Sequence, residues 1–282
     1  MIAACTDLDR TLIYSANALM LADPDAALRC VEIYDLKPLS YLTDRSAALI
    51  ELLATSATLV PTTTRTPAQY RRIRLPGPPP RFAICANGGY ILEDGEEDPS
   101  WTARVRKAVA DCAPAVDVHD HMSSVSGTHT LNLKIAAELF PYAVVDRAAL
   151  PETWLADLAA WCADRRWTVS LQGRKVYCLP EPLTKSAAAA EVARRCDASH
   201  LVAAGDSLLD TELLRIADAA VRPAHGELEE QAWTAENVTI TESRGVRAGE
   251  EIAAWLLARA LAPAFVPRTG LWRTLTPASP AS

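Results

Sequence analysis

The first dozen residues constrain the fold more than any other stretch of the chain. An apolar run, Ile2 to Cys5, ends in two carboxylates spaced two apart, Asp7 and Asp9, and Thr11 follows them. The length of the run and its abrupt polar end are typical of a buried parallel strand. In open α/β sheets, ligands bind outside the carboxyl ends of the strands. The pattern therefore predicts an α/β fold with both acids at a ligand-binding edge. An acidic loop that only closes a strand gives the same pattern and stays an alternative.

The two acids suggest a particular chemistry. Carboxylates crowded at a strand end repel each other and lose solvation, and a divalent cation would offset both effects. One carboxylate of such a pair can attack phosphorus while the other transfers the proton.

Polar groups also follow two later apolar runs. Residues 57–61 are followed by three threonines and Arg65, and residues 201–204 lead into Gly205-Asp206, with a second acid at Asp210. A hydroxyl and a guanidinium at a strand end can hold a phosphoryl oxygen and a second anionic group. The alternative is that the threonines are simply β-favoured and that Arg65 begins a solvated turn.

A lysine opens the alanine-rich helix predicted from Lys185 to Arg195. The helix dipole disfavours a cation in the first turn, so this lysine suggests an anionic partner unless its side chain is solvated. Earlier in the chain, an apolar strand predicted at 82–86 ends in the sharp turn Asn87-Gly88-Gly89.

Length and composition bound the function. The chain has 282 residues, of which 50% are hydrophobic, and this length and composition suit a packed core domain with an insert. Its net charge is -7. The acidic balance argues against nucleic acid as a partner. Seven cysteines without a Cys-x-x-Cys pair argue against a zinc or disulfide framework. Since no signal peptide or stretch of ~18 apolar residues occurs, we expect a cytoplasmic protein with no membrane partner. A homo-oligomer stays open.

The chain changes character after the Asn-Gly-Gly turn. We expect residues 1–89 and 177–262 to form a Rossmann-like parallel-sheet core, and residues 90–176 to form an inserted α/β domain. The long connection 13–42 is expected to be a flap near the first strand end. Residues 263–282, rich in Pro, Thr and Ser, are expected to be a flexible tail.

The motifs fall in a recognisable order. Asp7-x-Asp9-x-Thr11 comes first, then Thr63 and Arg65, then Lys185, then Gly205-Asp206-x-x-x-Asp210. This order resembles the haloacid dehalogenase (HAD) phosphohydrolase superfamily, over about residues 1–256. The insert between the second and third motifs and the Asn-Gly-Gly turn are similar to its Cof-type, sucrose-phosphatase-like branch with a C2-type cap. The resemblance implies a Mg²⁺-dependent phosphatase acting on a small phosphorylated metabolite, such as a sugar or sugar-acid phosphate.

The resemblance also implies catalytic roles. Asp7 would attack phosphorus and form an aspartyl-phosphate. Asp9 would protonate the leaving oxygen and later activate water. Thr63 would hydrogen-bond a phosphoryl oxygen, with its neighbours Thr62 and Thr64 as alternatives, and Lys185 would neutralise phosphoryl charge and orient Asp7.

The same resemblance implies a Mg²⁺ site and substrate contacts. Asp7, the backbone carbonyl of Asp9 and Asp206 would hold the ion, with Asp210 in support. Candidates for substrate contact are Arg10, Arg65 and Asn87. The sequence departs from the family at Arg10, where glycine is usual, and at Leu209, where asparagine is common. Arg10 either faces the substrate or points to solvent.

Two other functions remain compatible with these residues. A phosphomutase shares the aspartyl-phosphate step with a phosphatase. A non-catalytic module that binds a metabolite would keep the fold without turnover, although all the principal polar groups are present in this chain.

Overall fold

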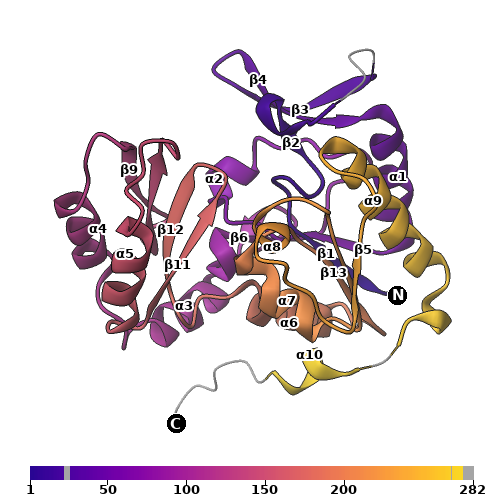
Figure 1. Cartoon of the computed structure of the whole chain (residues 1–282). Coiled ribbons are helices and arrows are strands. Elements are labelled where there is room, and N and C mark those ends of the chain that lie inside the picture. The colour runs from indigo at the N-terminus through magenta and orange to yellow at the C-terminus, as the bar shows by residue number, and fades with distance from the viewer. Residues whose placement is uncertain (22–25, 268, 276–282) are drawn as a thin grey trace, which may run out of the picture. The chain divides into compact units, whose positions relative to one another are not determined.

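The computed structural model describes residues 1–21, 26–267 and 269–275. The chain divides into two compact units (Figure 1). One comprises Met1–Asp98 with the described residues from Thr184 onward, and the other comprises Pro99–Leu183. The insert therefore begins later than the expected 90–176, because residues 90–93 pair with residues 82–85 of the first unit, and it ends later because residues 175–180 pair with strands of the second unit.

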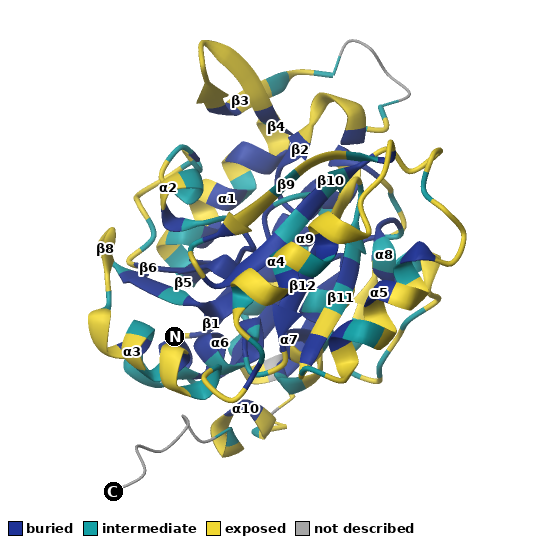
Figure 2. Ribbon diagram, turned by 90° about the vertical axis from the view of Figure 1, so that its left-hand side faces the viewer, coloured by how far each residue is buried: buried dark blue, intermediate teal, exposed yellow. Residues whose placement is uncertain are grey.

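A five-stranded parallel sheet, in the order β15-β14-β13-β1-β5, forms the centre of the first unit. Its strands are β1 (Ala3–Thr6), β5 (Thr58–Pro61), β13 (Leu201–Ala204), β14 (Ala219–Arg222) and β15 (Val238–Ile240). Thr6 pairs with Pro61 on one side and Ala204 on the other, so three strands end at the same level. The strands are mostly buried (Figure 2), as continuous apolar runs predict. The expected α/β fold class is confirmed.

Helices cover both faces of this sheet. On one face α1 (Asp44–Ser56) packs with α9 (Val246–Leu261). Ile50 of α1 and Leu256 of α9 belong to one hydrophobic core cluster with Ile2, the residue before β1. On the other face lie α6 (Lys185–Arg195) and α7 (Thr211–Ile216) (Figure 1). The helix α6 begins where the Thr184 hydroxyl caps the backbone N–H of Ala187 at 3.4 Å.

Two small antiparallel sheets complete the first unit. A hairpin of β3 (Leu28–Tyr34) and β4 (Lys37–Thr43) pairs with β2 (Tyr14–Ser15), in the connection expected to form a flap. The second sheet consists of β6 (Phe82–Cys85), β7 (Tyr90–Glu93) and β8 (Glu96–Glu97). Short helical elements are η1 (Ala16–Ala18), α2 (Pro67–Tyr70), η2 (Ala86–Gly88), η3 (Leu208–Asp210), α8 (Glu227–Glu230), η4 (Pro263–Phe265) and α10 (Leu271–Thr274).

The second unit is itself an α/β domain. Its antiparallel sheet has the order β11-β12-β10-β9. The strands are β9 (Thr130–Ala136), β10 (Phe140–Val145), β11 (Trp167–Gln172) and β12 (Lys175–Pro180), and the helices are α3 (Pro99–Ala108), α4 (Ala115–Ser124) and α5 (Trp154–Ala163). Buried Met122, Leu158 and Cys178 contribute to its core, and the Sγ of Cys178 lies 3.5 Å from the Sδ of Met122.

The segment expected to be a flexible tail packs on the first unit as far as Leu275. Trp272 is 1% exposed, and its indole N–H donates to the buried carboxylate of Asp218 at 2.9 Å. The same carboxylate accepts from the backbone N–H groups of Thr269 and Gly270. A Pro-, Thr- and Ser-rich composition does not reveal this anchor, because the acceptor lies 54 residues earlier. Residues 268 and 276–282 of the expected tail lie outside the described residues.

Among the described residues, no helix combines the length and the apolar character that a membrane crossing requires.

Candidate active site

Three parallel strands deliver their polar residues to one edge of the sheet. The backbone N–H of Asp7 donates to the carbonyl of Ala204 at 2.9 Å, and that of Thr62 donates to the carbonyl of Thr6 at 2.8 Å. The polar residues after β1, β5 and β13 therefore lie at the same level, as the carboxyl ends of parallel strands must. This edge brings together the expected residues Asp7, Asp206 and Asp210.

Lys185 links the first motif to the last. Its ammonium group, 1% exposed, donates to the Oδ1 of Asp7 and to the Oδ1 of Asp210, both at 2.7 Å. Burial alone would lower the pKa of Lys185, but Asp210 and Asp7 raise it above its ordinary value. Lys185 is therefore a buried, charged donor that fixes one oxygen of Asp7, and its position in the first helical turn is explained by these two anions.

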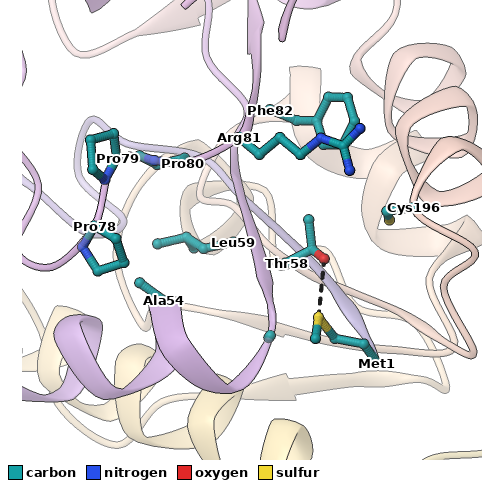
Figure 3. Close-up of a pocket in the computed structure, with 11 residues that line it drawn as sticks. Met1, Ala54, Thr58, Leu59, Pro78, Pro79, Pro80, Arg81, Phe82 and Cys196 are labelled. Atoms are coloured by element: carbon teal, nitrogen blue, oxygen red, sulfur yellow. Dashed lines mark hydrogen bonds between the residues drawn. The ribbon is translucent and has the colours of Figure 1, made fainter. Parts of the chain in front are cut away.

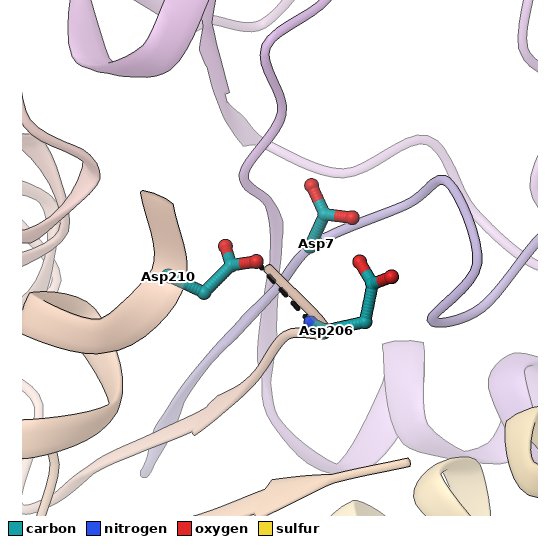
Figure 4. A group of neighbouring side chains, drawn as sticks. All are labelled: Asp7, Asp206 and Asp210. Carbon is teal, nitrogen blue, oxygen red and sulfur yellow. Dashed lines mark hydrogen bonds between the residues drawn. The ribbon is translucent and has the colours of Figure 1, made fainter. Parts of the chain in front are cut away.

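The three aspartates form a buried cluster whose carboxylates lie within 4.8 Å of one another (Figure 4). The Oδ2 of Asp210 accepts from the backbone N–H groups of Asp206 and Ser207 at 3.2 and 3.0 Å, so the cluster is built into the turn that follows β13. Burial raises the pKa of Asp7 to about 7; Asp210 and Asp9 also raise it, while Lys185 opposes the shift. Burial, followed by Asp7 and Asp210, raises the pKa of Asp206 well above its ordinary value.

The cluster fits a small divalent cation. Three carboxylates face Lys185 and, beside Asp206, Arg10, and the remaining excess of negative charge is what a cation would offset. Carboxylate oxygens are the ligands Mg²⁺ prefers. Gly226, at φ +90°, keeps the space beside Asp206 open, because a Cβ there would lie 2.5 Å from the Oδ2 of Asp206. The side chain of Asp9 is not part of this cluster.

Asp9 is held instead by Arg65. The Nε and Nη2 of the guanidinium donate to the two carboxylate oxygens of Asp9, each at 2.7 Å, and the Nη1 donates to Glu32 at 2.8 Å. Arg65 was expected to contact substrate directly; in the structure its guanidinium is shared by two carboxylates. Sequence reasoning missed Glu32, because nothing in the spacing of the 13–42 connection indicates which of its residues faces the sheet edge.

Arg10 occupies the position where the resembling family has glycine, and its backbone explains that preference. Its φ is +65°, a left-handed conformation that costs a side-chain-bearing residue more than glycine. Its side chain was expected to face either the substrate or solvent. In the structure it pairs with Asp206, with the Nε 3.3 Å from the Oδ2. Arg10 thus contributes positive charge beside the aspartate cluster.

A buried histidine supports the Arg10 loop. The Nδ1 of His225 accepts from the backbone N–H of Gly245 at 3.0 Å, which leaves the Nε2–H to donate to the carbonyl of Arg10 at 2.8 Å. Burial lowers the pKa of His225 to about 4. The ring is therefore neutral and holds the Arg10 backbone in place. The sequence did not indicate this role, because His225 lies 215 residues from Arg10.

Thr63 and Asn87 meet at the end of β5. Thr63 is buried and its hydroxyl accepts from the backbone N–H of Arg65 at 3.1 Å, while the N–H of Asn87 donates to the carbonyl of Thr63 at 3.0 Å. The hydroxyl of Thr62 donates instead to the carbonyl of Val60 at 3.0 Å, so it is engaged with its own strand. Gly88, at φ +98°, lets the turn approach Thr184, where a Cβ would overlap the carbonyl at the start of α6.

No protein-family model matches the sequence, and no curated protein matches it. Solved structures match nearly the whole chain. A sucrose-phosphatase from Synechocystis sp. PCC6803, solved in complex with sucrose and phosphate, has a TM-score of 0.64 at 18% identity, covering 90% of this chain and 97% of that one. The fold is that of the HAD phosphatases.

Two further structures agree with that fold. Protein 0175 of Thermoplasma acidophilum has a TM-score of 0.60 at 13% identity, covering 91% of this chain and 98% of that one. The HAD subclass IIB sugar phosphatase BT4131 has a TM-score of 0.51 at 14% identity, covering 92% and 100%. At these identities the likeness establishes the architecture, and the chemistry is argued from the site.

A cavity of about 310 Å³ has none of the aspartates of this edge in its lining, which Figure 3 shows. It is lined at the amino ends of the strands by residues such as Thr58 and Phe82, together with a proline run, Pro78–Pro80. Arg81, a charged residue of its lining, pairs with Glu93 at 2.7 Å. The cavity thus offers mainly apolar surface and no convergent set of charged groups, so it is not a candidate for the chemistry described above.

Proposed function

We propose that this protein is a Mg²⁺-dependent phosphatase that hydrolyses a small phosphorylated metabolite through an aspartyl-phosphate. The observation that carries the proposal is Lys185, buried and shared by Asp7 and Asp210 at the carboxyl edge of a HAD-type sheet. An ammonium group there supplies the positive charge that phosphoryl transfer needs, beside a carboxylate placed to attack.

Each residue has a distinct role in this proposal. Lys185 holds the Oδ1 of Asp7, so the carboxylate is oriented and its other oxygen can form the bond to phosphorus. As that bond forms and the bond from phosphorus to the leaving oxygen breaks, Asp9 gives a proton to the leaving oxygen, and to do so it must carry that proton in place of one of its two hydrogen bonds from Arg65. Asp9 then takes a proton from the water that hydrolyses the aspartyl-phosphate. The hydroxyl of Thr63 donates to a phosphoryl oxygen.

The metal-binding residues in this proposal are Asp7, Asp206 and the backbone carbonyl of Asp9, with Asp210 holding the turn in place. When bound, Mg²⁺ would neutralise the charge on the phosphoryl oxygens. The cluster geometry supports this assignment, since the three side chains are buried and close together.

A sugar or sugar-acid phosphate is the substrate class we propose. The support is the fold, which the chain shares with a sucrose-phosphatase and with a subclass IIB sugar phosphatase. In this proposal the Pro99–Leu183 unit is the cap that selects the substrate, and the enzyme acts in the cytoplasm on small molecules rather than on nucleic acid or membranes.

The decisive experiment is hydrolysis of p-nitrophenyl phosphate with Mg²⁺ or with a chelator, comparing the wild type with Asp7→Asn. We expect Mg²⁺-dependent release of inorganic phosphate that the variant lacks. Asp44→Asn is the control, because it changes an exposed carboxylate at the start of α1. A panel of sugar phosphates then tests the substrate class, and return of the phosphoryl group to the sugar would indicate a mutase.

The contradicting result is equally clear. A wild-type protein that releases no phosphate in Mg²⁺, and that does not bind beryllofluoride at Asp7, would refute the phosphatase and favour a non-catalytic module.

A further inference from the structure

Glu32 is a buried carboxylate on the β3–β4 hairpin that the reaction above does not use. It is 2% exposed. The hydroxyl of Ser40 donates to its Oε2 at 2.6 Å, and Arg65 and Arg72 donate to its Oε1 at 2.8 and 3.2 Å. Burial would raise the pKa of Glu32, but Arg65, Ser40 and Arg72 together lower it below its ordinary value. A carboxylate so placed is charged and fully paired, so its removal takes one anionic partner from Arg65 and from Arg72.

The backbone around Glu32 is fixed at an irregular point of the hairpin. The pairing of β3 with β4 shifts register on both sides of Glu32, and Glu32 also bridges to Ile73. The backbone N–H of Arg74 donates to the carbonyl of Val31 at 2.8 Å. At this irregularity the side chain of Glu32 lies against Arg65 and Arg72.

Arg65 has two edges, and the structure assigns a carboxylate to each. The Nη1 faces Glu32, and the Nε and Nη2 face Asp9. The guanidinium is planar, so fixing one end fixes the direction of the opposite edge. Arg72 is a second cation beside Glu32. The two arginines together therefore match the two carboxylates, and Arg65 can contact Asp9 and Glu32 at the same time.

We propose that Glu32 is a positioning residue for proton transfer by Asp9, acting through Arg65. By holding the Nη1 of Arg65, Glu32 presents the other edge of the guanidinium to Asp9 and so determines where that carboxyl group stands. This inference rests on the proposed phosphatase function. It also gives the hairpin inserted between the first and second motifs a part in the chemistry.

The role has a consequence that a purely structural residue would not share. Loss of positioning should matter most when the leaving oxygen needs a proton. Phenolate is a poor leaving group and depends on that proton, whereas p-nitrophenolate is stabilised by its nitro group and depends on it less. The ratio kcat/KM covers the steps up to departure of the leaving group, so it reports the proton transfer.

The test compares Glu32→Gln with the wild type in Mg²⁺, using phenyl phosphate and p-nitrophenyl phosphate. We expect kcat/KM for phenyl phosphate to fall at least about tenfold more than for p-nitrophenyl phosphate, mainly through kcat, since a positioned general acid contributes about 10²–10⁴ in rate. Ser40→Ala removes the hydroxyl that donates to the Oε2 of Glu32 without changing the charge of Glu32, and should shift the ratio in the same direction by less. It keeps the test usable should Glu32→Gln fold poorly.

Glu250→Gln is the matched control. Glu250 is also buried, accepts from the hydroxyl of Thr43 at 2.6 Å and pairs with Arg247 at 2.7 Å, but has neither Arg65 nor Asp9 among these partners. It should alter stability without altering the ratio of the two substrates. An equal fall for both substrates in Glu32→Gln, or no fall, overturns the positioning role while the phosphatase stands. A wild type that hydrolyses neither substrate overturns the proposed function, and this inference with it.

Discussion

Replacing Asp7 by asparagine should stabilise the metal-free protein while abolishing hydrolysis. Asp7 is 6% exposed, and burial raises its pKa to about 7 from 3.8, with Asp210 and Asp9 also raising it and Lys185 opposing. Between these two values the folded protein holds a proton that the unfolded chain has released. The contribution of Asp7 to stability therefore falls as the pH rises from about 4 to about 7 and stays level above that.

The magnitude follows from the size of the shift. Each pKa unit corresponds to about 1.4 kcal/mol, so a shift of roughly three units lowers the free energy of unfolding by about 4 kcal/mol above neutral pH. Asparagine is neutral at every pH, as protonated Asp7 is, and Lys185 keeps its bond to Asp210. We expect Asp7→Asn to recover about 2–4 kcal/mol, the lower figure allowing for imperfect packing of the amide.

Thermal unfolding followed by circular dichroism in a chelator measures this gain. At about pH 8 the variant should melt on the order of 10 °C above the wild type, and the gap should narrow at about pH 5. Adding Mg²⁺ should raise the wild type more than the variant, because binding to the folded state stabilises it. A lower melting temperature for Asp7→Asn in the chelator, or a gap that does not change with pH, would refute the reasoning.

Three further predictions concern the surroundings of the cluster and the carboxy-terminal segment. Arg10→Gly should tighten Mg²⁺ binding several-fold by calorimetry, because it removes a cation 3.3 Å from Asp206 and suits the φ of +65°; unchanged or weaker binding would contradict this. Gly226→Ala should weaken Mg²⁺ binding at least about tenfold, since its Cβ would lie 2.5 Å from the Oδ2 of Asp206. An alanine variant that binds the metal normally would show that the turn can shift at little cost. Asp218→Ala should lower the free energy of unfolding by about 2–4 kcal/mol and speed hydrogen exchange around Trp272, because it deletes several buried hydrogen bonds. Unchanged exchange there would mean that Asp218 is not the anchor.

Much of the fold and the centre of the site could be predicted from the sequence. Apolar runs that end in acids locate β1 and β13, and parallel strands place their carboxyl ends at one edge, so Asp7 and Asp206 were expected at the same edge of the sheet. Lys185 opens its helix at a position that the dipole disfavours, and that local conflict correctly indicated nearby anions. The boundary of the insert was placed too early, because β7 continues a sheet of the first unit beyond a turn that resembled a domain boundary.

By itself, therefore, the sequence determined which residues lie at the edge of the sheet, because periodicity and strand ends are local properties. Only the tertiary structure decided their partners. The pairing of Asp9 with Arg65 joins residues 56 apart, and that of Arg65 with Glu32 depends on a bulge in the hairpin. His225 beneath the Arg10 carbonyl and Trp272 on Asp218 are likewise contacts between distant segments. Such contacts form because buried polar groups require partners once the chain is compact, and which partner is within reach depends on packing rather than on spacing along the sequence.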